Sequence, residues 1–123
     1  MQTRITAVYP GSPTLVDATL VDVGVRAAWV GISPTAGELV DVEVDIDAVL
    51  GWGDSIAVDG AEGALRSGPL LRGTVEQRER GVLTLRTTEG PIQVEVDNRS
   101  TDVPLGTAVA VLAEHLTLYP TGV

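Results

Sequence analysis

The chain has 123 residues, enough for one domain or two very small ones, and 44% of them are hydrophobic although Phe is absent. It contains neither Cys nor Lys, which excludes disulfides, thiolate nucleophiles, Cys-ligated zinc and any chemistry that needs a lysine amine. The formal net charge of -9 disfavours nucleic acid and anionic membranes as partners and favours a basic protein.

Hydrophobic residues alternate with polar ones along most of the chain, and no long stretch shows the 3.6-residue period of an amphipathic helix. The aliphatic residues are mostly branched and favour strands. We therefore predict an all-β fold, a small barrel or sandwich of about ten short, mainly antiparallel strands. The predicted strands are 4–9, 18–26, 27–32, 39–47, 55–58, 70–77, 82–87, 92–97, 107–112 and 116–119.

Turn residues separate these strands at short intervals. Ser33–Gly37 and Thr88–Pro91 have turn composition, and Arg80-Gly81 predicts a tight hairpin because Gly accepts a positive φ. His115, the chain's single histidine, is expected in the turn of a last hairpin, and the glycine-rich stretch 59–68 is expected to be a linker.

The clearest element is Val40–Asp47, in which four aliphatic residues alternate strictly with Asp41, Glu43, Asp45 and Asp47. One face of this strand is predicted to pack in the core and the other to carry only carboxylates. That face is either a simple solvated surface, a protein-binding stripe or a cation site.

Trp52 follows this strand between two glycines, and Asp54 lies close by in the sequence. The indole is predicted either to close one end of a barrel or to anchor a partner. In the second case Trp52 and Asp54 would extend the partner-binding surface formed by the carboxylates of the preceding strand.

The tetrapeptide Val-Glu-Val-Asp occurs at 42–45 and again at 94–97, and each copy is followed by Leu-Gly and a short aliphatic strand. This pattern suggests two similar β-modules, an acidic one at 1–58 and a second at 69–123, joined by the linker 59–68. The alternatives are that amphipathic strands merely resemble each other and that the whole chain packs as one domain.

Residues 70–119 resemble the TOBE and related OB-like small-barrel modules. The resemblance consists of strand and turn residues: Gly73-Thr74-Val75, Gly81, Gly90-Pro91-Ile92, Leu105-Gly106 and Leu116-Thr117-Leu118-Tyr119. It implies a small barrel, and members of that group bind small oxyanions or serve as accessory domains. No ligand residue of the group can be matched here, so the resemblance implies the fold and not the activity.

Catalytic residues are not predicted. Gly53-Asp54-Ser55-Ile56 resembles the nucleophile block of GDSL-type hydrolases, but the other blocks are missing and His115 is the only candidate base. We expect no enzyme activity, no cofactor and no metal site. A cytoplasmic location is expected because no apolar run approaches the roughly 20 residues that span a bilayer and residues 1–10 do not resemble a signal peptide.

The leading hypothesis is a non-catalytic protein-binding module that holds a basic partner through the carboxylates of 41–47, as a small inhibitor or immunity-type protein would. The competing hypothesis is a duplicated barrel that binds a small anion or other small ligand, is similar to the TOBE group and forms a homo-oligomer. A third hypothesis is a structural accessory domain.

Overall fold

The computed structural model describes residues 1–97 and 103–121, and this part of the chain is almost entirely β. It contains one short 3-10 helix, η1 (Glu62–Ala64), between the sixth and seventh strands. The strands are β1 (Gln2–Tyr9), β2 (Thr14–Leu20), β3 (Val23–Trp29), β4 (Leu39–Ile46), β5 (Val49–Leu50), β6 (Ile56–Val58), β7 (Leu70–Glu79), β8 (Val82–Thr87), β9 (Gly90–Val96), β10 (Ala108–Leu112) and β11 (Leu116–Pro120). The predicted all-β class is confirmed.

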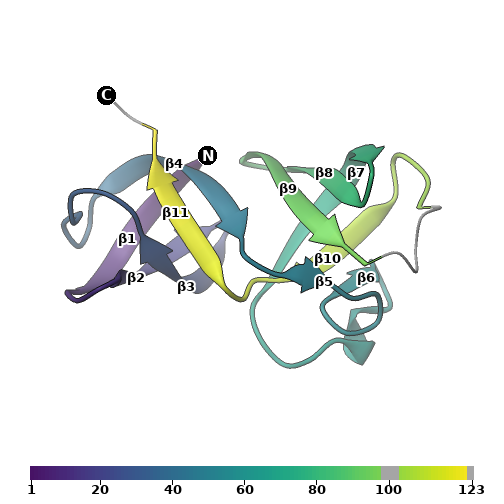
Figure 1. The fold of residues 1–123 in the computed structure, drawn as a ribbon, viewed down its shortest axis with the longest axis horizontal. Coiled ribbons are helices and arrows are strands. Elements are labelled where there is room, and N and C mark those ends of the chain that lie inside the picture. The colour runs from purple at the N-terminus through teal and green to yellow at the C-terminus, as the bar shows by residue number, and fades with distance from the viewer. Residues whose placement is uncertain (98–102, 122–123) are drawn as a thin grey trace.

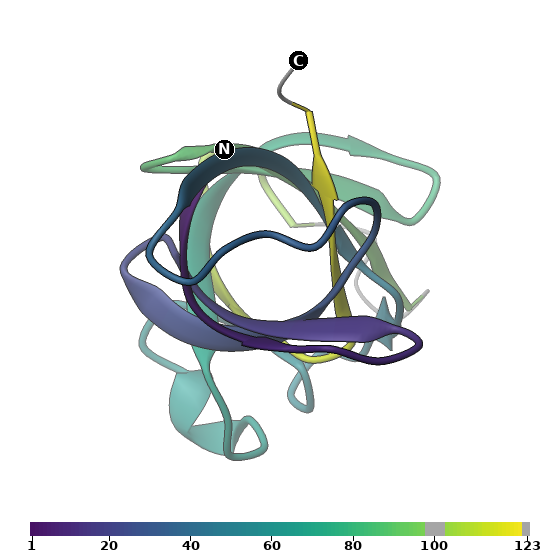
Figure 2. The ribbon, with the colours of Figure 1, turned by 90° about the vertical axis from the view of Figure 1, so that its left-hand side faces the viewer.

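The strands form two sheets that lie side by side along the long axis (Figure 1). The first is a closed barrel with the order β1-β2-β3-β11-β4, which is compatible with an OB-like fold. Figure 2 looks into this barrel and shows the loop 30–38 crossing its mouth. The second sheet has the order β5-β9-β8-β7-β10-β6, and its two edge strands are joined by the turn 51–55.

The two sheets exchange strands. The chain crosses from the barrel to the second sheet between β4 and β5, and it returns between β10 and β11 (Figure 1). In the barrel, β11 pairs in parallel with β3 and antiparallel with β4. In the second sheet, β5 pairs in parallel with β9 and β6 pairs antiparallel with β10. Neither sheet therefore consists of strands from 1–58 alone or from 69–123 alone.

Both sheets follow the same strand path. A three-stranded meander, β1-β2-β3 or β7-β8-β9, pairs through its first strand with β4 or β10 and through its third strand with a strand from the other half. Local details repeat as well. The Ile5 N–H donates to Glu38 O and the Val75 N–H donates to Thr107 O, both at 2.9 Å. The pairing register shifts directly after Ile5 and after Val75, so these two residues occupy equivalent places.

This correspondence corrects the alignment that the sequence suggested. The first Val-Glu-Val-Asp copy lies in β4, whose counterpart is β10, whereas the second begins in β9, whose counterpart is β3. The aliphatic strands that follow the two copies, 56–58 and 109–111, are not counterparts either, because they pair with each other as β6 and β10. The tetrapeptide recurs because both strands have one buried and one exposed face.

Most predicted strands agree with the observed ones within two residues, but the hairpin of β2 and β3 does not. Strands predicted at 18–26 and 27–32 are wrong, since the chain turns at Val21 and Asp22, which have φ values of 48° and 61°. Positive φ at two consecutive residues suits a two-residue hairpin, but a β-branched residue rarely adopts it. The sequence therefore lacked the usual Gly or Asn signal. The hairpin at Arg80-Gly81 is confirmed, with φ values of 50° and 81°.

The prediction that His115 lies in the turn of a last hairpin is also wrong. The strands on either side of it, β10 and β11, belong to different sheets and do not pair with each other. His115 lies on the crossover between the sheets and is exposed. Two short strands in sequence usually form a hairpin, but here the crossover of residues 113–115 carries the chain back to the barrel.

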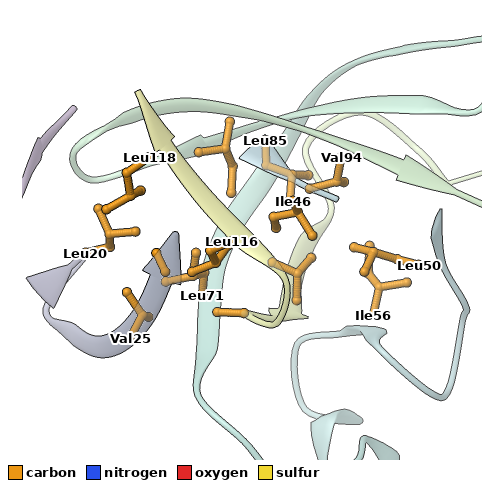
Figure 3. Packing of buried hydrophobic residues seen from close by; sticks show 14 of the residues in the cluster. Leu20, Val25, Ile46, Leu50, Ile56, Leu71, Leu85, Val94, Leu116 and Leu118 are labelled. Carbon is orange, nitrogen blue, oxygen red and sulfur yellow. The ribbon is translucent and has the colours of Figure 1, made fainter. Parts of the chain in front are cut away.

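One hydrophobic core runs through both sheets. Figure 3 shows Ile46 and Leu116 between barrel residues such as Leu20 and second-sheet residues such as Leu85. All four are less than 9% exposed, and they belong to the same buried cluster. Trp29 is also buried in this cluster. The exchanged strands thus contribute to a single continuous interior.

Candidate functional site

The strand β4 turns its carboxylates outward. Val42 and Ile46 are buried while Asp41, Glu43, Asp45 and Asp47 are exposed, which confirms the predicted alternation. We call these four carboxylates the acidic strand face. The strand lies in the barrel beside β1 and β11, so this face is part of the outer surface of the barrel.

Six carboxylates elsewhere in the described residues have an arginine partner. The pairs are Asp17–Arg26 at 2.8 Å, Asp54–Arg66 and Glu114–Arg66 at 3.0 Å, Asp59–Arg72 at 2.7 Å, Glu62–Arg72 at 3.6 Å and Glu76–Arg86 at 2.8 Å. On the acidic strand face, Asp41 lies 3.7 Å from the N-terminal amine, and the other three carboxylates take part in no ion pair within the described ranges. Negative charge on this strand is therefore left largely uncompensated.

Asp45 and Asp47 are neighbours on the outer side of the strand and influence each other. A hydrogen bond to Asp47 raises the pKa of Asp45, and burial and the negative charges of Asp47 and Glu95 raise it further. The hydroxyl of Thr117 donates to Asp47 Oδ2 at 2.8 Å, and this bond, together with the one to Asp45, lowers the pKa of Asp47. The pair thus holds one proton more tightly than two separate carboxyls would.

We expect Asp47→Asn to lower the pKa of Asp45 towards its ordinary value, because the hydrogen bond between the two carboxyl groups is lost together with the neighbouring negative charge. An NMR titration of the side-chain carboxyl carbons measures this directly. Asp41→Asn serves as the control and should leave the Asp45 titration unchanged. If the Asp45 titration were the same in Asp47→Asn as in the unaltered protein, the two groups would not be linked.

The structure places Trp52 and Asp54 away from this strand, in the turn between β5 and β6 of the second sheet. The indole of Trp52 is half-buried against the core, and its Nε1 is buried without a hydrogen-bond partner. Asp54 is exposed and bonded to Arg66. The six predicted site residues therefore divide into the acidic strand face and a separate pair on the other sheet.

Two clefts lie where the sheets meet. The larger, of about 900 Å³, lies against β2 and β3 and is lined by Thr6, Asp17–Thr19, Gly24–Arg26, Pro69 and 113–115. The smaller, of about 430 Å³, lies against β8 and β9 and is lined by Met1, 42–44, Gln77, Thr84 and 91–93. The meanders that contribute to them are counterparts, so the clefts occupy similar places. Their chemistry differs, because Arg26 and His115 line only the larger one.

Other features bear on the class of function. Within residues 1–97 and 103–121, no three His or acidic side chains are arranged to hold a metal ion. No helix in this part of the chain has the length and apolar character needed to cross a bilayer. Comparison of the chain with protein-family models gives no match, and comparisons with curated proteins and with solved structures give none either.

Proposed function

We propose that this chain is a non-catalytic protein-binding module that holds a basic partner through the acidic strand face. The observation that carries the proposal is the concentration of carboxylates on one strand without ion-pair partners. Six carboxylates elsewhere are paired with arginines, whereas Glu43, Asp45 and Asp47 form no ion pair with another described residue. Positive side chains of a partner would relieve the mutual repulsion of these groups.

The geometry of β4 supports this proposal. A strand presents same-face side chains every two residues, so the carboxylates form a row along the outer barrel surface. Such a row suits an extended or helical basic segment better than a single ion. A small inhibitor or immunity-type protein acting on a cationic target would have this charge and size, and a cytoplasmic location remains a prediction.

Charge reversal of the acidic strand face tests the proposal. We expect Asp41→Lys, Glu43→Lys, Asp45→Lys and Asp47→Lys together to weaken binding of an arginine-rich peptide by about tenfold to a hundredfold, since each exposed charge contact contributes about 0.2–1 kcal/mol. Calorimetry at two salt concentrations measures the affinity, which should also fall as salt screens the charges.

The matched control reverses the same number of exposed carboxylates elsewhere, with Asp59→Lys, Glu76→Lys, Glu79→Lys and Glu89→Lys. Both variants have the same net charge, so a general attraction between the acidic protein and the peptide would weaken equally in both. Equal affinity in the two variants would contradict the proposal. Circular dichroism of each variant shows whether it keeps its fold.

A second candidate function is the binding of a small anion by a duplicated barrel similar to the TOBE group. The observation that favours it is the larger cleft between two sheets of the same strand path, which is lined by the guanidinium of Arg26, paired with Asp17, and by the imidazole of His115. Native mass spectrometry in the presence of inorganic phosphate separates the two candidates. An oligomer that retains the anion, and loses it in Arg26→Gln, would favour the second.

A further inference from the structure

The outer surface of the barrel carries large apolar side chains beside the acidic strand face. Tyr9, Leu15, Val30 and Tyr119 are 42%, 37%, 45% and 39% exposed. Three of them lie on β1, β2 and β11, and Val30 directly follows β3; these strands are consecutive around the barrel. Exposed apolar residues scattered singly are ordinary, but a group on adjoining strands is typical of an interaction surface.

The strand register connects this apolar group to the carboxylates. Tyr9 is paired with Leu15, Leu15 with Ala28, Ala28 with Thr117, and Thr117 with Asp45. Paired residues on neighbouring strands project from the same side of a sheet. One row across five strands therefore changes from apolar at β1 and β2 to acidic at β4.

A groove of about 370 Å³ lies along the middle of this row. Leu15, Ala28 and Thr117 line it, together with Ala27 and Leu116, while Asp47, Arg26 and His115 contribute charged or polar edges. The lining is thus mainly apolar, with Arg26 of β3 at one edge and the carboxylate of Asp47, directly after β4, at another. This shape and chemistry suit an aliphatic side chain whose neighbours in sequence are basic.

The apolar side of the surface is held in place by its own contacts. The Tyr9 hydroxyl donates to Asp17 Oδ2 at 2.8 Å, and the Arg26 guanidinium lies 4.7 Å from the centre of the Tyr9 ring. Arg26 also donates to both carboxylate oxygens of Asp17, at 2.8 and 3.1 Å. The charges of Arg26 and Asp17 compensate each other, so this arginine does not oppose a basic partner as a free cation would. A surface ordered in advance loses less entropy on binding.

We propose that the groove between Leu15 and Thr117 receives an aliphatic side chain of the basic partner while the acidic strand face binds the cationic residues beside it. The inference rests on the proposed function and specifies the chemistry of the partner. A recognised segment would combine arginine or lysine with a leucine-like residue, and a purely cationic segment would bind less tightly.

Two synthetic peptides of equal charge test this inference. One is arginine-rich with a leucine at its centre, and the other has serine in place of that leucine. We expect the unaltered protein to bind the leucine peptide about tenfold more tightly, the discrimination typical of a small apolar pocket. The difference should disappear in Leu15→Ser and in Ala28→Leu, which fills the groove from within, while the affinity for the serine peptide is unchanged.

Leu105→Ser is the matched control, since Leu105 is 60% exposed and lies outside the barrel. It should keep the tenfold difference. Equal binding of both peptides by the unaltered protein, or a preference that survives in both groove variants, would overturn the inference. The proposed function would still stand if charge reversal on β4 weakened both peptides. Failure of both peptides to bind the unaltered protein would overturn both proposals.

Discussion

Two fragments made by dividing the chain between Gly63 and Ala64 are expected to be unfolded when separate and to regain β structure when mixed. The fragment 1–63 contains four barrel strands but lacks β11, and it carries β5 and β6 without the strands that pair with them. The fragment 64–123 contains four strands of the second sheet but lacks β5 and β6, and it carries β11 without β3 and β4. An open sheet with unpaired edges and an incomplete core is not stable alone. Circular dichroism and amide NMR spectra of each fragment and of the mixture measure the outcome.

A full-length chain nicked at the same bond, with both pieces kept together, serves as the control and should keep the native spectrum. The division falls in η1, which contributes no buried residue. Well-dispersed amide signals from either fragment alone would contradict the prediction. In that case the exchanged strands would be additions to two independent modules and not parts of each other's sheets.

Leu118→Ala should lower the free energy of unfolding by about 2–5 kcal/mol, the usual cost of removing a fully buried leucine side chain. Leu118 is completely buried in β11, where it is paired with Trp29 on β3 and with Val44 on β4. A cavity there weakens the closure of the barrel and the core shared with the second sheet. Urea unfolding followed by tryptophan fluorescence measures the effect.

Leu50 supplies a comparison from the other sheet. It is 3% exposed and pairs with Val96 on β9, as Leu118 pairs with Trp29 on β3. We therefore expect Leu50→Ala to have a similar cost and both variants to unfold in one transition, since the core is continuous. Tyr119→Ala, at a half-exposed neighbour, should cost less than about 1 kcal/mol. Separate transitions for the two sheets, or equal effects of Leu118→Ala and Tyr119→Ala, would contradict this expectation.

The acidic strand face and the apolar row beside it illustrate why part of a site can be predicted from sequence. The carboxylates lie on one strand, so the alternation of Val40–Asp47 was enough to place them on one face. Tyr9, Leu15 and Tyr119 lie on different strands and share a surface only because of the barrel register. Nothing in the sequence around each of them distinguishes it from an ordinary exposed residue.

Trp52 and Asp54 show that residues close together in the sequence can lie on different surfaces. They follow the acidic strand closely in the sequence, and this suggested one continuous surface. The crossover from β4 to β5 instead carries them into the second sheet, where Asp54 is bonded to Arg66. Short separation along the chain does not guarantee a shared face when a strand changes sheets.

The sequence by itself determined the all-β class, most of the strand positions and the outward carboxylates of β4, because these depend on the local alternation of apolar and polar residues. Only the tertiary structure decided that β11 closes the barrel and that β5 and β6 complete the second sheet. Pairing between strands far apart in sequence depends on the total burial and hydrogen bonding of the folded chain. The amphipathic pattern of a single strand is compatible with several partners, so it leaves that choice open.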